Sequence, residues 1–323
     1  MSRKVGGPAI FGAMPALDLN ALRHRLPSHP LTRFAPSPTG YLHLGHVANA
    51  IWVWGVARAL DGQVLLRIED HDRGRSRAEY ERAILEDLEW LGLNPDRGSP
   101  EELRRGSSSF RQSDCGAAYA AALERLGRSE TVYACDCSRR EIALEGGDRL
   151  NQETRYAGQC RARGLTPGIG RGIRVALPEA PETFTDARLG EVVQVPSRQC
   201  GDLLLRDRNG NWTYQLAVVV DDLRHDVDLV IRGEDLLSST GRQIMLGRML
   251  GREQAPVLLH HPLIMKENGA KLSKSSGDTG VRELRAAGAT PDRVLGEAAW
   301  RTGLLDRPEP IAASDLAALF LRH

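Results

Sequence analysis

The sequence has no run of about 18 apolar residues, the length that a helix needs to cross a bilayer. Its N-terminal region also lacks the continuous apolar core of a secretory signal peptide, because Gly6, Gly7, Gly12 and Pro15 interrupt it. With 41% hydrophobic and 26% charged residues, the chain is neither disordered nor collagen-like. Its 323 residues predict a cytoplasmic protein of about two domains.

Lysine is scarce, because 39 of the 43 basic residues are arginine and only 4 are lysine. Three of these lysines, Lys266, Lys271 and Lys274, fall within nine residues of sequence. A general preference for arginine explains the ratio but not the clustering, so this segment is a candidate functional loop. The formal net charge of +1 provides no overall attraction to nucleic acid.

Cysteine is rare too, and its odd number of five argues against a disulfide framework in a cytoplasmic chain. Cys135, Cys137 and Cys160 lie close together in sequence, with the spacing of metal ligands. Cys115 and Cys200 are isolated, and we expect them to be buried, unreactive thiols.

Strand and helix signals alternate after residue 30. We expect a short strand at 32–35, a buried helix at 47–60 and a second strand at 64–68. Apolar residues between positions 84 and 91 then recur at helical spacing. Strand, helix, strand is the order of a βαβ unit, so the sequence predicts an α/β fold with a parallel sheet.

The pattern changes between residues 131 and 199, where glycine, proline and arginine multiply and long apolar runs end. Between Arg139 and Arg174, eight arginines against four acidic residues leave a local surplus of +4. We interpret this stretch as a module inserted into one α/β domain, because apolar segments resume beyond it. The resumed elements are expected to be strands at 216–220, 227–231 and 257–259, and a helix at 241–250.

The chain is thus predicted to contain five units. These are an N-terminal arm (1–30), the first half of the α/β domain (31–130), the insertion (131–199), the second half (200–280) and a short C-terminal helical segment (281–323).

A first motif, His43-Leu-Gly-His46, follows the turn Pro36-Ser-Pro-Thr-Gly40, where a predicted strand leads into a helix. The start of a helix offers free backbone N–H groups and a positive dipole end, which together bind anions. Imidazole donors would add hydrogen bonds to a phosphate, and Gly45 would allow a flat ring to approach the backbone. A helix cap with two surface histidines is the alternative.

The second motif, Lys271-Leu-Ser-Lys274-Ser, coincides with the lysine cluster. A lysine ammonium is a compact, mobile charge that can follow a phosphate group as it leaves. Gly269 and the small serines are compatible with a loop that closes over a ligand. A solvated polar loop is the alternative.

Together the two motifs resemble the HIGH and KMSKS signatures of class I aminoacyl-tRNA synthetases. Segments 33–37, 67–70, 216–222 and 230–235 narrow the similarity to the glutamyl branch of that family, over roughly residues 31–280. The resemblance implies a ligase with a Rossmann-like catalytic domain. It also implies that the insertion is a zinc-containing module of the kind that receives the acceptor RNA.

The resemblance further implies which residues bind the substrates. Those around L-glutamate would be Arg33, Phe34, Ala35, Pro36, Ser37, Glu69, Tyr214 and Arg232. Those around ATP and its Mg²⁺ would be His43, Gly45, His46, Lys271 and Lys274, of which His43, His46 and Lys274 would be catalytic.

These assignments agree with elementary chemistry. A guanidinium fork binds a carboxylate in bidentate fashion, and ligands of α/β proteins collect at strand ends. Glu69 would suit the α-ammonium of an amino acid. An ion pair of Arg232 with Glu234 or Asp235 is the alternative for that residue. For Asp221 and Asp222, helix capping or sheet-end solvation fits the sequence as well as a binding role does.

For the metal, two thiolates in a tight Cys-x-Cys turn and a third from a later loop suit tetrahedral zinc. The resemblance implies that Tyr156, four residues before Cys160, is the fourth ligand, with Asp136 or water as competing candidates. Such a site would be structural and would stabilise the insertion. A chance cluster of reduced cysteines is the alternative.

The implied reaction joins glutamate to ATP as glutamyl-adenylate and then transfers the glutamyl group to RNA. Because only 48 residues follow Ser275, we expect no room for a helical anticodon-binding domain. The short members of this branch attach glutamate to queuosine in tRNA(Asp) and activate glutamate without tRNA, which is our first expectation, for a monomer. A minimal enzyme that charges the tRNA 3′ end, or a non-catalytic RNA-binding or regulatory module, are the alternatives.

Overall fold

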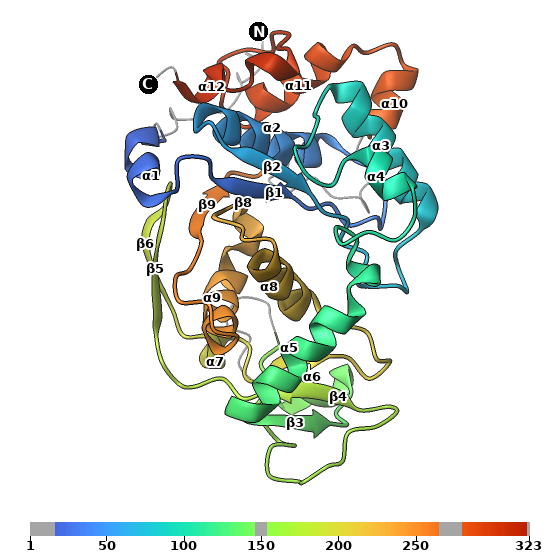
Figure 1. Cartoon of the computed structure of the whole chain (residues 1–323), viewed down its shortest axis with the longest axis vertical. Coiled ribbons are helices and arrows are strands. Elements are labelled where there is room, and N and C mark those ends of the chain that lie inside the picture. Colours follow the sequence, from blue (N-terminus) through green and yellow to red (C-terminus); the bar gives the residue numbers. More distant parts are fainter. Residues whose placement is uncertain (1–16, 146–153, 265–279, 322–323) are drawn as a thin grey trace, which may run out of the picture.

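A computed structural model describes residues 17–145, 154–264 and 280–321 (Figure 1). Its central element is a six-stranded sheet with the strand order β2-β1-β8-β9-β5-β6. The strands are β1 (Leu31–Phe34), β2 (Gln63–Leu66), β5 (Glu182–Asp186), β6 (Gly190–Gln194), β8 (Leu229–Gly233) and β9 (Val257–His261). All neighbours pair in parallel except β5 and β6, which form an antiparallel hairpin at one edge. The predicted parallel α/β sheet is confirmed.

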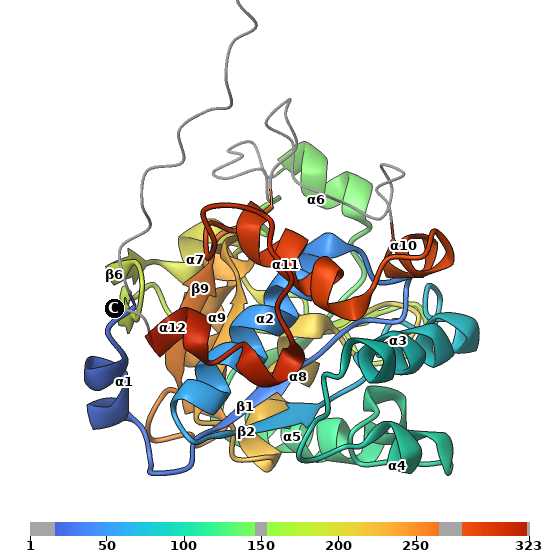
Figure 2. The same cartoon turned by 90° about the horizontal axis from the view of Figure 1, so that it is seen from above.

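Helices cover both faces of this sheet (Figures 1 and 2). On one face α2 (Leu44–Ala59) contacts β1 and β8 and is itself covered by α11 (Pro291–Arg301) and α12 (Ala318–Leu321). On the other face lie α8 (Tyr214–Arg224) and α9 (Thr240–Met249).

Alternation along the strands explains this layering, since successive side chains of a strand point to opposite faces. In β8, Leu229 and Ile231 join the core under α2, whereas Val230 between them packs with Ile244 of α9. Polar residues at even positions of β8 and β9 therefore face α8 and α9.

A second, antiparallel sheet has the order β3-β4-β7, with β3 (Val132–Cys135), β4 (Gly172–Val175) and β7 (Leu203–Arg206). It lies at the lower end of the molecule in Figure 1 beside α5 (Gly116–Ser129) and α6 (Arg139–Glu145), and α7 (Pro196–Gln199) precedes β7. Strand pairing thus divides the chain differently from the predicted boundaries at 131 and 199. Residues 182–194 belong to the large sheet, and β7, beyond residue 199, belongs to the small one. Strand periodicity shows which residues are buried but not which sheet a strand joins.

The predicted strand at 216–220 is wrong, because these residues lie inside helix α8. A run of five apolar residues is buried on all sides in either conformation, so periodicity cannot distinguish the two. Leu216, Ala217 and Val220 pack in a core with Met245 and Leu246 of α9 and Tyr119 of α5.

The ends of the described chain join the main core. Helix α1 (Leu19–Arg25), in the segment predicted as an N-terminal arm, buries Leu19 and Leu22 there. The remaining helices are α3 (Ala78–Leu91), α4 (Pro100–Arg104) and α10 (Val281–Ala286). Among the described residues, no helix has both the length and the apolar character that a membrane span requires.

Candidate active site

The His43-Leu-Gly-His46 motif begins helix α2, as predicted, and both histidines cap it. The Nδ1 atom of His43 accepts a hydrogen bond from the Gly45 N–H, and Nδ1 of His46 accepts one from the His43 N–H, each at 3.1 Å. The two rings lie 3.9 Å apart between centroids. A Cβ atom at Gly45 would come within 2.9 Å of the His43 ring, so a larger residue there would have to displace that ring. The structure therefore confirms the helix cap, which was the alternative interpretation of this motif.

Lys266, Lys271 and Lys274 lie outside the described residues, but the residues on either side of this segment meet α2. Gly280 forms an antiparallel bridge with His43, and Val281 N–H donates to Leu42 O at 2.9 Å. On the other side, Ile264 is buried in the core that contains α2. Positions 264 and 280 are therefore both anchored against the helix that starts with the two histidines.

Arg33 and the neighbouring Arg67 share one carboxylate at the carboxyl ends of β1 and β2. Asp222 of α8 accepts from Arg33 Nε at 3.3 Å and from Arg67 Nη1 at 2.7 Å. Arg67 Nη2 also donates to Glu69 at 3.0 Å. Burial alone would raise the pKa of Asp222, but Arg33 and Arg67 hold it below its usual value.

Asp221 is a structural residue. It accepts from the Tyr119 hydroxyl at 3.0 Å, from Gln112 at 2.8 Å and from Arg224 at 2.8 Å. The side chains of Asp221 and Asp222 cap no helix among the described residues, and both are partners of arginines.

Arg232, at the end of β8, is buried among neutral acceptors. Its Nε donates to His260 Nε2 at 3.0 Å, its Nη1 to Gln243 at 2.6 Å and its Nη2 to Thr240 at 2.8 Å. No described carboxylate forms an ion pair with it, and Glu234 pairs with Arg188 instead. Burial lowers the pKa of Arg232, and the positive charge of Arg33 acts in the same direction, while Tyr214 and Asp222 only partly offset the shift.

Tyr214, the first residue of α8, lies near Arg232 and also near Arg33 and Glu69. Arg232, Glu69 and Arg33 all act on the charge of its hydroxyl, which also lies near Gln243. Burial raises the pKa of Tyr214, so the hydroxyl is neutral and available as a donor. Arg33, Glu69, Tyr214 and Arg232 are thus brought together at the carboxyl ends of the parallel strands.

The segment 34–37 contributes differently. The Phe34 side chain is buried in the core, 5.3 Å from the Trp54 ring, so only its backbone faces the site. Pro36 O accepts from Glu69 N–H at 3.0 Å, which fixes Glu69 against this segment. Ala35 and Ser37 are partly exposed beside it.

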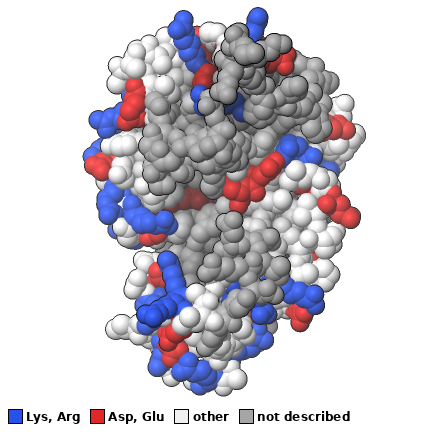
Figure 3. Space-filling view, turned by 180° about the vertical axis from the view of Figure 1, so that it is seen from behind, with Lys and Arg blue, Asp and Glu red and all other residues white. Residues whose placement is uncertain are grey.

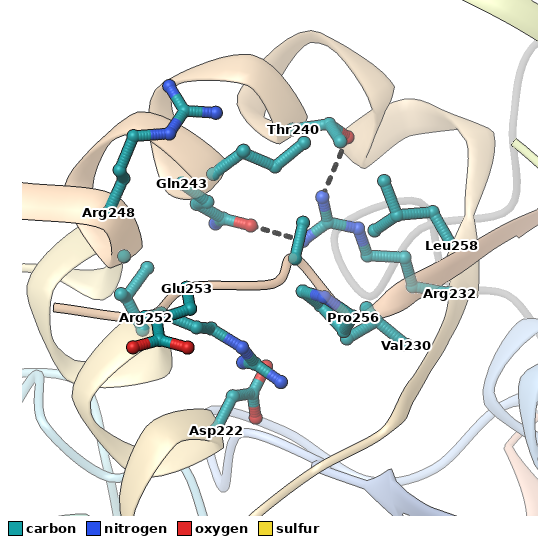
Figure 4. A pocket seen from close by; sticks show the side chains of 14 residues that line it. Asp222, Val230, Arg232, Thr240, Gln243, Arg248, Arg252, Glu253, Pro256 and Leu258 are labelled. Atoms are coloured by element: carbon teal, nitrogen blue, oxygen red, sulfur yellow. Dashed lines mark hydrogen bonds between the residues drawn. The ribbon is translucent and has the colours of Figure 1, made fainter. Parts of the chain in front are cut away.

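A small pocket lies between β8, β9, α8 and α9, and Arg232, Thr240 and Gln243 line one side of it (Figure 4). Asp222 and Arg252 line the opposite side in Figure 4. The pocket thus borders the Arg232 guanidinium.

Sequence reasoning missed Arg67, Thr240, Gln243 and His260. Arg67 had a signal, because a charged residue within an apolar strand must find a buried partner. The other three belong to different elements and are joined only by folding, so no local pattern predicts them.

The cysteine cluster in the insertion could hold a metal ion. The sulfurs of Cys135, Cys137 and Cys160 all lie within 4.8 Å of one another. In tetrahedral zinc, a Zn–S bond of about 2.3 Å puts two sulfurs about 3.8 Å apart, so the cluster has a suitable size. The Tyr156 hydroxyl accepts from Cys160 N–H at 3.0 Å and neighbours two of the sulfurs.

Asp136, a competing fourth ligand, forms a bidentate ion pair with Arg163, at 2.7 and 3.0 Å, and its Oδ1 atom also lies 3.5 Å from the Cys160 sulfur. The Arg174 guanidinium lies 3.7 Å over the Tyr156 ring, where its charge would favour an anionic cluster. Arginines also gather on the surface at the lower end of the molecule, together with acidic residues (Figure 3).

The parallel sheet, the histidine pair at the start of α2 and the arginines at the strand ends define the catalytic domain of a class I aminoacyl-tRNA synthetase. Residues 31–304 match the family described as tRNA synthetases class I (E and Q), catalytic domain, and the chain belongs to this family.

Individual relatives narrow the similarity. The chain is 40% identical over 304 residues to a Glutamyl-Q tRNA(Asp) synthetase of Symbiobacterium thermophilum, covering 89% of this chain and 91% of that protein. The protein of the same name from Deinococcus radiodurans is 39% identical, with 89% and 95% covered. A crystal structure of a glutamate tRNA ligase from Elizabethkingia meningosepticum, in complex with its amino acid, superposes with a TM-score of 0.73 at 26% identity. This match covers 89% of our chain but only 64% of the ligase.

Proposed function

We propose that this chain is an ATP-dependent ligase that activates L-glutamate and transfers it to the queuosine base of tRNA(Asp). The observation that carries the glutamate part is Arg232, a buried guanidinium whose three hydrogen bonds go to neutral acceptors. A buried charge without a counter-ion is costly, and a substrate carboxylate would supply the missing anion. The queuosine part rests on the relatives of nearly equal length.

In this proposal, glutamate lies between the two arginine groups. Arg232 and the Tyr214 hydroxyl would bind one carboxylate, in the bidentate manner that a guanidinium favours. Glu69, held by Arg67 and by the backbone of Pro36, would accept the α-ammonium. Arg33, fixed by Asp222, would contribute positive potential to the same site.

Activation would take place at the start of α2. The α-carboxylate oxygen of glutamate attacks the α-phosphorus of ATP, and the bond to the β-phosphate oxygen breaks to release pyrophosphate. His43, His46 and the backbone around Gly45 would face the phosphates, with Lys271, Lys274 and Mg²⁺ adding positive charge. The protein's contribution is positioning and electrostatic stabilisation of the leaving phosphates.

In the transfer step, a hydroxyl of queuosine attacks the glutamyl carbonyl carbon, and AMP leaves with the shared oxygen. The arginine-rich insertion would contact RNA phosphates. A zinc ion held by Cys135, Cys137, Cys160 and Tyr156 would fix the insertion without taking part in the chemistry. The substrates place the reaction in the cytoplasm.

Two assays test this proposal. Pyrophosphate exchange should require glutamate and ATP but not tRNA, and a protein without exchange would not be a glutamate-activating enzyme. Labelled glutamate should then appear on the anticodon-loop fragment of tRNA(Asp) that carries queuosine, and not on the queuosine-free tRNA. Label at the 3′ end instead would identify the alternative, an enzyme that charges tRNA in the ordinary way.

A further inference from the structure

A buried histidine connects Arg232 to a carboxylate on the β5–β6 hairpin. His260 of β9 is fully buried, with its Nδ1 atom 2.7 Å from Asp186 Oδ2 and its Nε2 atom 3.0 Å from Arg232 Nε. Asp186 ends β5 and is also fully buried. A chain of carboxylate, imidazole and guanidinium therefore reaches from the hairpin to the strand ends.

These distances determine where the imidazole proton lies. Arginine nitrogens only donate, so Nε2 of His260 must accept from Arg232 and carries no proton. Nδ1 must then hold the proton and donate it to Asp186, because a neutral imidazole has one N–H. Asp186 thus selects the tautomer that presents a lone pair to Arg232.

Other bonds hold both ends of this chain. Asp186 Oδ1 accepts from the N–H groups of Arg188 and Leu189 at 3.0 Å each, and Oδ2 also accepts from the His260 N–H at 3.0 Å. At the other end, Thr240 Oγ1 lies 2.8 Å from Arg232 Nη2 and 3.2 Å from His260 Nε2. The guanidinium is therefore held along one edge by two acceptors that are themselves fixed.

The three bonds of Arg232 use one N–H on each of its nitrogens. A second N–H remains on each terminal nitrogen for further acceptors, such as the Tyr214 hydroxyl or a substrate carboxylate. The orientation of these two groups depends on the edge held by His260 and Thr240.

We propose that Asp186 and His260 are positioning residues for amino-acid binding, which hold Arg232 so that its remaining N–H groups meet a glutamate carboxylate. The inference rests on the proposed function, since it assigns Arg232 to glutamate. It gives the β5–β6 hairpin a role in recognition of the amino acid. Neither residue touches the substrate in this arrangement.

Pyrophosphate exchange at varied glutamate and at varied ATP tests the proposal. His260→Leu removes the acceptor while keeping the volume, and we expect the KM for glutamate to rise about tenfold or more with the KM for ATP unchanged. His260→Gln retains an acceptor that can reach Arg232, so it should recover most of the loss. Asp186→Asn keeps the imidazole, but its amide donates to Nδ1 and moves the proton onto Nε2, against Arg232. It should therefore raise the KM for glutamate as well.

A matched control lies in the same hairpin. Glu182 of β5 forms a bidentate ion pair with Arg248, at 2.8 Å for both bonds, and does not contact Arg232. Glu182→Gln should lower the melting temperature and leave the KM for glutamate unchanged. A KM for glutamate that stays at the wild-type value in folded His260→Leu and Asp186→Asn would overturn the inference. Absence of exchange in the wild type would instead reject the proposed function.

A measurement on the wild type does not depend on the folding of the disruptive variants. In ¹⁵N-histidine spectra of the full chain, the His260 signal, assigned by its loss in His260→Gln, should show the Nδ1–H tautomer. The signal should remain that of a neutral His260 imidazole when glutamate is added. An Nε2–H tautomer would contradict the inference.

Discussion

At the scale of single residues, the buried arginines of the site differ in the charge of their hydrogen-bond partners. Arg33 and Arg67 share Asp222, and their charges are compensated inside the protein. Arg232 donates hydrogen bonds to neutral partners only. The three buried arginines thus have two kinds of hydrogen-bond partner, a shared carboxylate for Arg33 and Arg67 and neutral acceptors for Arg232.

Asp222→Asn tests this separation. The variant leaves two buried guanidinium groups without their shared anion, so we expect it to lower the free energy of unfolding by about 3–5 kcal/mol at pH 7. Because the pKa of Asp222 is held below its usual value, its stabilisation is present above the unfolded pKa and is lost as the pH falls through the folded pKa. Urea unfolding at pH 7 and in acid measures both, and the gap between wild type and variant should narrow in acid. A gap that widens in acid would contradict the assigned partners.

The pKa of Asp87 of α3 is shifted in the opposite direction to that of Asp222. It is 4% exposed, and its Oδ2 atom has no hydrogen-bond partner among the described residues. Burial raises its pKa to about 6, although Arg285 of α10 partly offsets this. The folded state therefore binds the proton more tightly than the unfolded state, and stability should fall as the pH rises from about 4 to about 6.

Asp87→Asn should remove this pH dependence. At pH 7 we expect the variant to be more stable than the wild type by up to about 3 kcal/mol, and the difference should vanish below about pH 4. Thermal unfolding at a series of pH values measures it. An equal difference at all pH values would show that the effect comes from packing instead of from the charge.

At the scale of elements, the sequence predicts the local conformation of a segment better than it predicts which other elements that segment packs against. The strands predicted at 32–35 and 64–68 and the helix predicted at 47–60 are confirmed as β1, β2 and α2. Each of them is defined by one apolar face or by one buried run of residues. The segment 216–220 was misassigned to a strand, since a fully buried helix shows the same short apolar run. The β5–β6 hairpin was assigned to the insertion, because nothing local indicates that Asp186 pairs with the chain around Leu258.

The same limit applies to the candidate site. Arg33, Glu69, Tyr214 and Arg232 were selected by resemblance, and the fold brings them together. Their supporting residues, such as Gln243 and His260, become neighbours only through the packing of α9 and β9. No spacing along the chain carries that information.

Helix α2 shows how close packing requires a particular residue. A Cβ atom at Gly55 would come within 2.3 Å of the Phe320 ring of α12, whereas one at Gly127 in α5 would have nothing within 4 Å. Gly55→Ala should therefore lower the free energy of unfolding by about 1–3 kcal/mol. Gly127→Ala should raise it by up to about 1 kcal/mol, because alanine favours the helix. Chemical unfolding of the pair measures the difference, and equal effects would mean that α12 does not pack on α2.

At the scale of the whole molecule, the two sheets carry different candidate sites, and the proposed metal site belongs to the smaller sheet. The cysteine cluster forms a small core of its own, in which Cys135 and Cys160 pack with Tyr156. We therefore expect zinc loss to affect RNA handling more than glutamate activation. Cys160→Ser should abolish binding of one zinc per chain, measured by elemental analysis.

In that variant, transfer of labelled glutamate to tRNA(Asp) should fall at least about tenfold, while pyrophosphate exchange stays within about threefold of the wild type. Cys115→Ser is the matched control, since Cys115 is buried outside the cluster and its thiol donates to the Ser109 and Arg111 carbonyls, which a hydroxyl can also do. It should retain zinc and both activities. A parallel fall of exchange and transfer in Cys160→Ser would contradict this expectation. It would show that the insertion and the catalytic sheet unfold as one unit, through the hydrophobic core that β7 and α8 share.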